Sequence, residues 1–584
     1  MFGLVPLKAM AATPQLAHGV IVKLKERGPV VPPALQGNPS RWSFDSSTRQ
    51  HMRLVSAAWR QGVQFDSIKR SAFAAHVLRT KQPIPLAQAE AFAKRLAQDA
   101  DVEWALPNAI EKAATVGAPN DTYYAVQSWL YPRVSDTRGV ADFPLAWNRL
   151  YGLSLNPVVV AVLDSGVPGG HEDLDNQLLP GYDFVSDVEN ARDGNGLDSD
   201  ASDPGNWLSP GEIASNPVYY SGCRPHDSSW HGLAIAGMLA ARTNNWVGGA
   251  GMLWQLRSTP SNPFLLPVRI AGACGAEVSD IIEGMLWAAG VAYQGSPSLN
   301  ANPARVINLS FGGDGACTGN LQAGSPSWMY VQAVQALRRQ GVLVVASAGN
   351  GGSDEIGLPT PTRPANCPGV LAVTGLHVNG FKASFANLLV GVPDGIAVMS
   401  GETLGSSQAL DSVITTWHDG LTDLNSGSFT YGGMIGTSFS APMVAGTAAM
   451  MLAVNPALSV DQLVEGLKVS AMPFLTQSEA AANGLPSNLP QCDESSASTR
   501  GQCYCTTRTC GAGILNAPQA IDYALATTGD RVVGSPETAT FFTPDRLATT
   551  TTRGSSSGGG AMDLASLAFI SMLLGLTLLA GGKR

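Results

Sequence analysis

The chain has 584 residues, of which 14% are charged, and a formal net charge of −9 at pH 7. This length exceeds that of one ordinary domain and allows several parts. The acidic balance gives no support for a nucleic-acid partner. The low share of charged residues, beside abundant Gly, Ser and Thr, suits a secreted protein.

The N-terminal residues 1–16 allow two interpretations. Residues 2–7 are apolar, and Ala9-Met10-Ala11 has the small residues of a signal-peptidase site. However, the apolar stretch is shorter than the ~7–15 residues of a signal-peptide core, and no basic residues precede it. The segment is either the remnant of a signal peptide or an unstructured terminus.

Residues 17–114 have the pattern of a small α+β domain. Residues 20–24 predict a strand, and apolar residues recur at helical spacing between Leu86 and Leu96. Residues 101–108 predict a second strand. By themselves, these elements indicate a folded domain without a defined role.

A buried strand is predicted next, at residues 158–163. Its continuous apolar run is typical of a strand covered on both faces, as in a parallel sheet. The run ends in Asp164, Ser165 and Gly166. Because ligands and catalytic groups gather at the carboxyl ends of such strands, Asp164 is a candidate functional residue.

A Gly-rich loop after this strand carries five side chains with oxygen ligands: Asp193, Asn195, Asp198, Asp200 and Asp203. Close carboxylates repel one another unless they are solvated or share a cation. Calcium binds several oxygen ligands in flexible geometry, so the loop is a candidate calcium site. The alternative is a solvated acidic turn.

His231 and Ser438 each stand at the start of an apolar helix. A lone histidine in that position is more often structural than catalytic. Gly436-Thr437-Ser438 precedes an apolar run to Leu452, which predicts a buried helix. Ser438 would lie at its N-terminus, where free N–H groups and the helix dipole favour developing negative charge. Taken alone, a helix-capping serine would also explain the pattern.

Together, Asp164, His231 and Ser438 occur in the chain order of the subtilisin triad. The three blocks resemble the subtilisin-like serine peptidases (subtilases), in particular the secreted bacterial group. The resemblance implies an α/β fold with a mainly parallel sheet for residues 115–530. It also implies a secreted, monomeric endopeptidase that hydrolyses proteins or peptides through an acyl-enzyme, with His231 as the base and Asp164 as its orienting group.

Two further segments, residues 305–313 and 341–350, resemble the family's substrate-binding strand and oxyanion strand. The resemblance implies that the Asn350 amide and the Ser438 N–H stabilise the oxyanion, although a residue after glycine is also commonly a turn residue. The implied substrate-binding residues are Ser310, Phe311, Gly312, Ala348 and Gly349. One departure is Leu233, where the family usually has threonine. It removes no triad group, so we expect a change in packing or specificity.

The resemblance also assigns a role to residues 17–114. It implies a propeptide that assists folding and inhibits the enzyme by laying its C-terminal end in the active site. The mature chain would then begin between Ala113 and Asp121. A second calcium candidate is Asp173, because many subtilases bind calcium there with help from an N-terminal glutamine such as Gln127.

Eight cysteines in an exported domain predict disulfides, whose connectivity the sequence alone does not fix. The resemblance implies the pairs Cys223–Cys274 and Cys317–Cys367. The other four lie in a Cys-rich insert near residues 490–512: Cys492, Cys503, Cys505 and Cys510. A zinc site is the alternative for this insert, although no histidine is near and the spacing does not fit a ribbon.

The C-terminal segment changes in composition. Residues 531–560 contain Thr and Ser-Gly runs and predict a flexible linker. Within residues 561–584, the apolar run from Leu564 to Ala580 is near the ~17-residue lower limit of a membrane span. The basic residues Lys583-Arg584 would stay on the cytoplasmic side. The segment resembles glycine-glycine-type bacterial sorting tails, with a plain membrane anchor as the alternative.

Two other function classes compete with a peptidase. A catalytically silent binding or adhesion protein could keep the fold, but the presence of Asp164, His231, Ser438 and Asn350 argues against it. An esterase could use the same triad, since it handles any acyl group. The strand-edge segment around Ser310 favours a peptide substrate.

Overall fold

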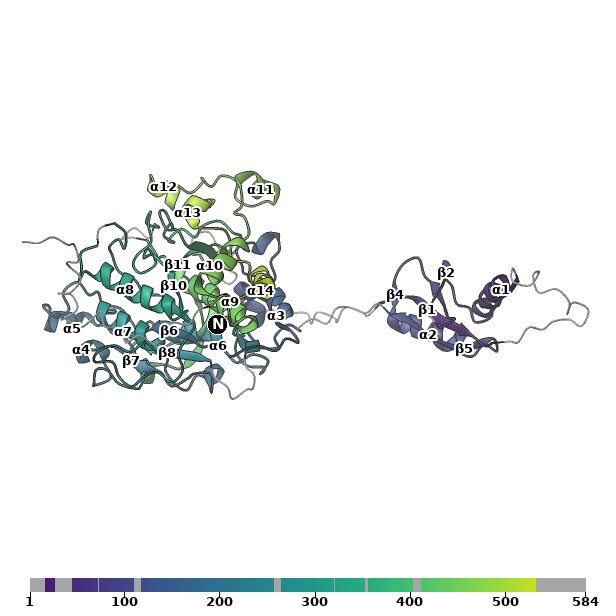
Figure 1. Cartoon of the computed structure of the whole chain (residues 1–584), viewed down its shortest axis with the longest axis horizontal. Coiled ribbons are helices and arrows are strands. Elements are labelled where there is room, and N and C mark those ends of the chain that lie inside the picture. Colours follow the sequence, from purple (N-terminus) through teal and green to yellow (C-terminus); the bar gives the residue numbers. More distant parts are fainter. Residues whose placement is uncertain are drawn as a thin grey trace, which may run out of the picture. The chain divides into compact units, whose positions relative to one another are not determined.

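The structure is a computed structural model. It describes residues 16–26, 45–71, 73–109, 117–256, 264–319, 321–351, 356–402 and 411–531, with the side chains of 45–49 excepted. Apart from Leu16 and Arg531, the predicted signal-peptide remnant, linker and sorting tail lie outside these residues. The chain divides into two compact units, Met1–Thr115 and Val116–Arg584 (Figure 1).

The first unit is a five-stranded antiparallel sheet with two helices. Strand β1 pairs with β3, β4 and β5, and β2 pairs with β3. Apolar side chains of β1 and α2, among them Val20, Val22, Ala93 and Leu96, form its core. The element bounds are β1 (Leu16–Leu24), α1 (Asp45–Arg60), β2 (Ser67–Arg70), β3 (His76–Arg79), β4 (Ile84–Pro85), α2 (Leu86–Leu96) and β5 (Val102–Ala109).

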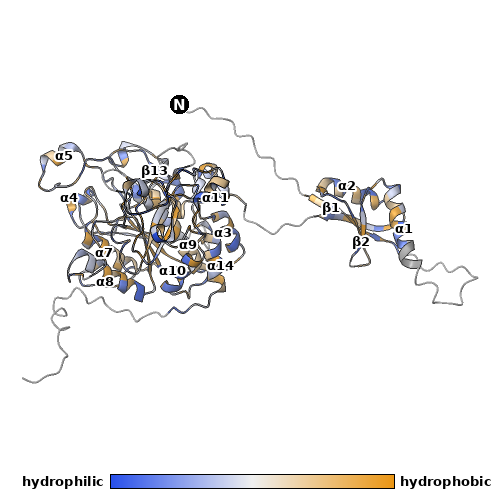
Figure 2. Ribbon diagram, turned by 90° about the horizontal axis from the view of Figure 1, so that it is seen from above, coloured by the Kyte–Doolittle hydropathy of each residue, from blue (hydrophilic) through white to orange (hydrophobic). Residues whose placement is uncertain are grey.

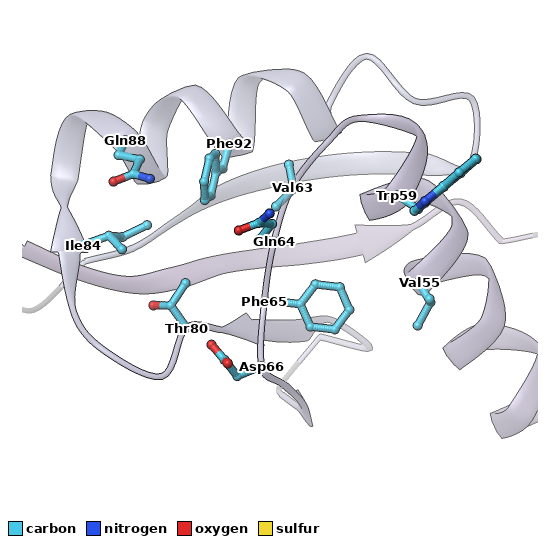
Figure 3. A pocket seen from close by; sticks show the side chains of 10 residues that line it. All are labelled: Val55, Trp59, Val63, Gln64, Phe65, Asp66, Thr80, Ile84, Gln88 and Phe92. Carbon is cyan, nitrogen blue, oxygen red and sulfur yellow. The ribbon is translucent and has the colours of Figure 1, made fainter.

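A hollow of about 490 Å³ lies within this first unit (Figure 3). Residues from α1, α2 and the segments between them line it, including Val55, Phe65, Gln88 and Phe92. Trp59 stands at its rim with 83% of its surface exposed. None of the predicted catalytic residues lies in this unit.

The second unit is built on a seven-stranded sheet in the order β12-β11-β10-β9-β6-β8-β7, in which every pair is parallel. This confirms the predicted α/β fold with a mainly parallel sheet. The strands are β6 (Val160–Asp164), β7 (Tyr182–Asp183), β8 (Leu265–Arg269), β9 (Val306–Leu309), β10 (Leu343–Ser347), β11 (Val370–Leu376) and β12 (Gly395–Met399).

Helices cover both faces of this sheet, so successive strand residues enter different cores. In β6, Val160 and Val162 pack in one core with α6 and α9, whereas Ala161 and Leu163 pack in the other with α7 and α8. Both faces are therefore apolar, which explains why β6 has a continuous apolar run rather than an alternating one. In Figure 2, α7 and α8 carry hydrophilic as well as hydrophobic residues, as helices between a sheet and solvent do.

The remaining elements surround this sheet. A two-stranded antiparallel sheet joins β13 and β14 and packs against α6. The bounds are α3 (Phe143–Leu150), α4 (Val188–Ala191), α5 (Pro210–Ser215), α6 (His231–Ala240), α7 (Val278–Ala288), α8 (Pro326–Arg339), β13 (Val413–His418), β14 (Phe429–Met434), α9 (Thr437–Val454), α10 (Val460–Val469), α11 (Gln477–Ala482), α12 (Ala497–Arg500), α13 (Thr507–Cys510) and α14 (Ala517–Ala526).

Helix α9 passes through the core of the second unit. Among the described residues it is the one helix long and apolar enough to cross a membrane, but 89% of this 18-residue helix is buried inside the protein. Pro442 lies inside it and has no N–H to donate to the carbonyl of Ser438, one turn earlier. The Ser310 hydroxyl donates to that carbonyl instead, at 2.9 Å.

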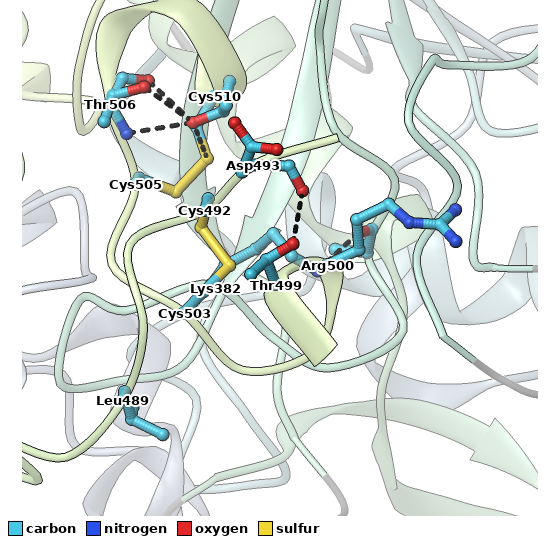
Figure 4. Close-up of a disulfide and its surroundings, with 12 residues drawn as sticks. Lys382, Leu489, Cys492, Asp493, Thr499, Arg500, Cys503, Cys505, Thr506 and Cys510 are labelled. Carbon is cyan, nitrogen blue, oxygen red and sulfur yellow. Dashed lines mark hydrogen bonds between the residues drawn. A yellow bond between two sulfur atoms is a disulfide. The ribbon is translucent and has the colours of Figure 1, made fainter. Parts of the chain in front are cut away.

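All eight cysteines form disulfides. The structure contains Cys223–Cys274 and Cys317–Cys367, the two pairs that the family resemblance implies. In the insert, Cys492 pairs with Cys503 and Cys505 pairs with Cys510 (Figure 4). The sulfur atoms of Cys492, Cys505 and Cys510 lie within 4.8 Å of one another, but each belongs to a disulfide, so none is a free thiolate for zinc.

Candidate active site

Three predicted catalytic residues lie at the carboxyl edge of the large sheet. Asp164 is the last residue of β6, His231 is the first residue of α6, and Ser438 is the second residue of α9. The structure thus brings together, at the predicted edge, residues that are far apart in the sequence.

Asp164 and His231 are joined by a short hydrogen bond. His231 Nδ1 lies 2.7 Å from Asp164 Oδ1, and Asp164 is completely buried. The backbone N–H of Ser165 donates to the same carboxylate oxygen at 2.9 Å. Gly232 allows this approach, because a Cβ there would lie 2.2 Å from the carbonyl oxygen of Gly166.

The surroundings of His231 determine its pKa in two opposing ways. Burial alone lowers the pKa of an imidazole, because it penalises the charged form. The negative charge and the hydrogen bond of Asp164, with a further contribution from the charge of Asp203, outweigh burial and raise the pKa of His231 above its ordinary value. The site therefore stabilises an imidazolium, the form that a general base adopts after taking a proton.

Ser438 is nearly buried and lies beside the end of β9. Its hydroxyl donates to the carbonyl oxygen of Ser310 at 3.4 Å. No hydrogen bond joins Ser438 Oγ to His231, although the structure describes both residues. Hydrogen bonds of this kind are often long in the absence of substrate and tighten in the substrate complex.

The Asn350 side chain is oriented by Thr437, the residue before Ser438. Its amide oxygen accepts hydrogen bonds from both the backbone N–H and the hydroxyl of Thr437, each at 2.8 Å. Because two donors face the amide oxygen, the amide NH₂ must point the other way. The Asn350 NH₂ therefore faces away from Thr437. Ser438, at the second position of α9, has a backbone N–H without an intrahelical partner.

The predicted substrate-binding residues follow two neighbouring parallel strands, β9 and β10. Ser310, Phe311 and Gly312 continue from β9, and Ala348 and Gly349 continue from β10. The Phe311 ring lies edge-on to the imidazole of His231, with 5.7 Å between the ring centroids. Phe311, in the middle of the predicted substrate-binding segment after β9, thus contacts His231.

Leu233 does not reach this site. Leu233 is a residue of α6 and its side chain is completely buried in the core. Its backbone carbonyl accepts a hydrogen bond from the hydroxyl of Thr416 in β13 at 2.8 Å. The departure from the family pattern is therefore a packing difference.

Asp203 lies behind the Asp164–His231 pair, apart from the other members of the predicted calcium loop. Its carboxylate is completely buried and accepts from the hydroxyl of Ser165 at 2.7 Å and from the N–H of Gly205 at 2.9 Å. Burial raises the pKa of Asp203 to about 6. Ser165 Oγ in turn accepts from the N–H of Gly232 at 3.1 Å. Asp203 is thus linked through Ser165 to the backbone of His231's helix, a contact that the sequence did not suggest.

The other four residues of that loop also have protein partners. Asp193 forms an ion pair with the buried Arg269 at 2.5 Å. Asn195 donates to Asp198 at 2.7 Å, and the N–H of Asp200 donates to the other oxygen of Asp198 at the same distance. Among the described residues, no three of these carboxylates converge closely enough to form one ligand group.

Asp173 lies against the loop of residues 245–250, together with Gln127. It is completely buried and accepts from Asn245 at 2.9 Å and from the N–H of Gly249 at 3.0 Å. Gln127 accepts from the N–H of Ala250 at 2.7 Å. Burial nevertheless raises the pKa of Asp173 to about 6, so its negative charge is poorly compensated.

Comparison with known proteins identifies relatives of this chain. Residues 156–504 match the model of the subtilase family. An extracellular protease of Xanthomonas campestris pv. campestris is 33% identical over 483 residues, which cover 83% of this chain and 70% of that protein. An extracellular basic protease of Dichelobacter nodosus is 30% identical over 448 residues, which cover 76% of this chain and 64% of that protein.

A solved protease structure from Pseudoalteromonas arctica is similar at a TM-score of 0.55 and 32% sequence identity, covering 70% of this chain and 100% of that one. The chain belongs to the subtilase family. It is a serine endopeptidase.

The raised pKa of His231 predicts the pH dependence of activity. The base must be neutral, so kcat/KM should rise with pH through a midpoint above the ordinary imidazole value of about 6.5. Asp164→Asn removes the charge that raises the pKa, so the midpoint should move down while kcat falls by about 10⁴-fold. The measurement is kcat/KM on a chromogenic peptide from about pH 5 to about pH 9.

The matched control is Asp200→Asn, which removes an exposed carboxylate without touching the site and should leave the midpoint unchanged. A wild-type midpoint at or below the ordinary value, or an unmoved midpoint in Asp164→Asn, would contradict the role given to Asp164.

Proposed function

We propose that this chain is the self-processing precursor of a secreted serine endopeptidase with a catalytic triad of Asp164, His231 and Ser438. The observation that carries the proposal is the 2.7 Å hydrogen bond between buried Asp164 and His231, at the sheet edge where Ser438 is the second residue of α9. Secretion rests on the relatives named extracellular proteases. The substrates are proteins or peptides, bound along the segments after β9 and β10.

The first chemical step is attack of Ser438 Oγ on the carbonyl carbon of the scissile peptide. His231 Nε2 takes the hydroxyl proton, and Asp164 holds the Nδ1 proton and stabilises the imidazolium. The carbonyl oxygen becomes an oxyanion, which the Asn350 amide and the Ser438 N–H stabilise.

His231 then gives its proton to the leaving amine as the C–N bond breaks, which leaves an acyl-enzyme on Ser438. Water attacks this ester by the same route, with His231 again as the base. The carboxylate product leaves, and the serine hydroxyl is restored.

Residues 17–114 are proposed to be the propeptide. In support, the first compact unit has its own core and immediately precedes the peptidase unit in the chain. Its β5 ends at Ala109, just before the segment in which we expect cleavage, between Ala113 and Asp121. The apolar tail at residues 561–584 is proposed to be a sorting or anchoring signal, which rests on sequence alone.

Ser438→Ala should abolish both self-processing and the hydrolysis of casein. Loss of a triad nucleophile costs about 10⁶-fold in kcat, so no cleavage between the two units should be detectable. The measurement is the intact mass of the purified protein together with casein hydrolysis.

Ser440→Ala is the matched control, because Ser440 lies on the same helix but donates to backbone carbonyls of β12. It should be processed and hydrolyse casein normally. A Ser438→Ala protein that still processes itself and digests casein at the wild-type rate would show that the triad assignment is wrong.

We also propose a structural calcium ion, held on the side of Asp173. The residues there fit a cation: Asp173 and Asp121 are buried carboxylates with pKa values raised by burial, and no basic side chain among the described residues pairs with either. The ion would supply the positive charge that these carboxylates lack and would fasten the loop of residues 245–250. Asp198 and Asp200, which are exposed, are the second candidates.

Calcium bound only to the native state should lengthen the half-life of inactivation on heating. A chelator should therefore shorten the half-life of the wild type, while Asp173→Asn should be short-lived with or without it. Asp198→Ala/Asp200→Ala should keep the chelator effect. If this double variant alone abolishes the effect, the ion is in the acidic loop; if a chelator leaves the wild type unaffected, the calcium proposal is wrong.

A further inference from the structure

Asn387 lies directly behind the backbone that carries Asn350. It is completely buried, and its N–H donates to the carbonyl of Gly349 at 3.0 Å. Its side-chain amide donates to the carbonyl of Ala348 at 2.9 Å and accepts from the N–H of Gly351 at 2.9 Å. One residue thus holds the main chain on both sides of Asn350.

Asn387 approaches Gly349 so closely that only glycine fits at position 349. A Cβ on Gly349 would lie 2.6 Å from the Asn387 side-chain nitrogen, and Gly349 has a φ of +97°. Both the left-handed conformation and the space require glycine there. The turn that aims Asn350 therefore forms against the Asn387 amide.

Asn387 itself is held from two sides. The hydroxyl of Thr374 in β11 donates to its carbonyl at 2.6 Å. On the other side, the buried side-chain nitrogen of Lys382 donates to the carbonyls of Ala383 and Ala386, each at 2.6 Å. Because Ala386 immediately precedes Asn387, this buried side chain holds the backbone that leads to Asn387.

Lys382 is in turn fixed to the Cys-rich insert. Its backbone N–H donates to the carbonyl of Cys503 at 2.9 Å, and Figure 4 shows Lys382 beside the Cys492–Cys503 disulfide. A chain of hydrogen bonds through Lys382 and Asn387 thus connects the Cys-rich insert to the backbone next to Asn350, at the end of β10.

We propose that Asn387 is a positioning residue of the oxyanion hole, an inference that rests on the proposed role of Asn350 as a donor. Thr437 fixes the rotation of the Asn350 amide, and Asn387 fixes the backbone from which that amide projects. Asn387 is completely buried, so it acts through the backbone that it holds, and we assign its main effect to the position of Asn350 in the transition state.

The proposal predicts a split between kcat and KM. Asn387→Ala removes the amide and lets the Asn350 backbone shift, and a shift of about 1 Å can cost about 100-fold in rate. We expect kcat to fall by about 10-fold to 100-fold, with KM within about twofold of wild type, because the oxyanion exists only in the transition state. Active molecules are counted by titration with a fluorophosphonate.

The double variant Asn350→Ala/Asn387→Ala decides whether Asn387 acts through Asn350. In an Asn350→Ala background there is no amide left to position, so adding Asn387→Ala should lower kcat by less than about twofold. If instead the two losses multiply, Asn387 acts independently of Asn350 and the inference is wrong. If Asn350→Ala alone keeps the wild-type kcat, the proposed function of Asn350 fails, which is a separate result.

Two further variants guard against a purely structural effect. Asn300→Ala is the matched control, because Asn300 is also a buried asparagine that donates to backbone carbonyls, at 3.0 Å for Ala288, but it has no contact with the site. It should lower thermal stability without lowering kcat. Thr374→Val removes the hydrogen bond to the Asn387 carbonyl but keeps the Asn387 side chain. It should lower kcat by less than Asn387→Ala does, and this loss should also nearly disappear in the Asn350→Ala background.

If Asn387→Ala yields no folded enzyme, Thr374→Val carries the test. A wild-type kcat in both variants, or an equal loss of kcat in Asn300→Ala, would overturn the proposal.

Discussion

The hydrogen bond between Asp164 and His231 determines how closely the start of α6 must approach the end of β6. A separation of 2.7 Å between the two side chains is reached only because Gly232 has no Cβ against the Gly166 carbonyl. Ser165 then fills the remaining space with its hydroxyl, which links the backbone of α6 to Asp203. The contact between a strand end and a helix start thus sets the position of His231, the proposed base.

Buried charges at this edge are arranged so that the imidazolium is favoured. Asp164 and Asp203 both raise the pKa of His231, whereas the buried Arg269 is paired with Asp183 and Asp193. Arg269 therefore has carboxylate partners, whereas Asp203 accepts hydrogen bonds only from neutral donors and its negative charge acts on His231. A buried carboxylate removed from this arrangement would leave its partner uncompensated, which is costly in a low-dielectric interior.

The sequence predicted the parts of this site that depend on local signals. The apolar run before Asp164 and the apolar helices after His231 and Ser438 were read from periodicity and length, and the structure has β6, α6 and α9 at these places. The family resemblance supplied the grouping of the three residues. It also implied two cysteine pairs that the structure contains.

The remainder could not be predicted, because it depends on contacts between distant segments. Asp203 stands in an acidic loop, and only the folded chain shows that its carboxylate points inward to Ser165 rather than to a shared cation. Asn387 belongs to no recognisable motif, and its contacts to the oxyanion strand cross about forty positions of sequence, as in the bond to Ala348. The roles of Asp203 and Asn387 depend on how deeply each side chain is buried and on where it points, and neither property leaves a periodic pattern in the sequence.

If Ser438 is a nucleophile activated by His231, a fluorophosphonate should react with it. Mass mapping of labelled peptides should place the label on Ser438, and His231→Ala should slow labelling by at least about 100-fold. Label on a different serine, or an unchanged rate in His231→Ala, would contradict the account.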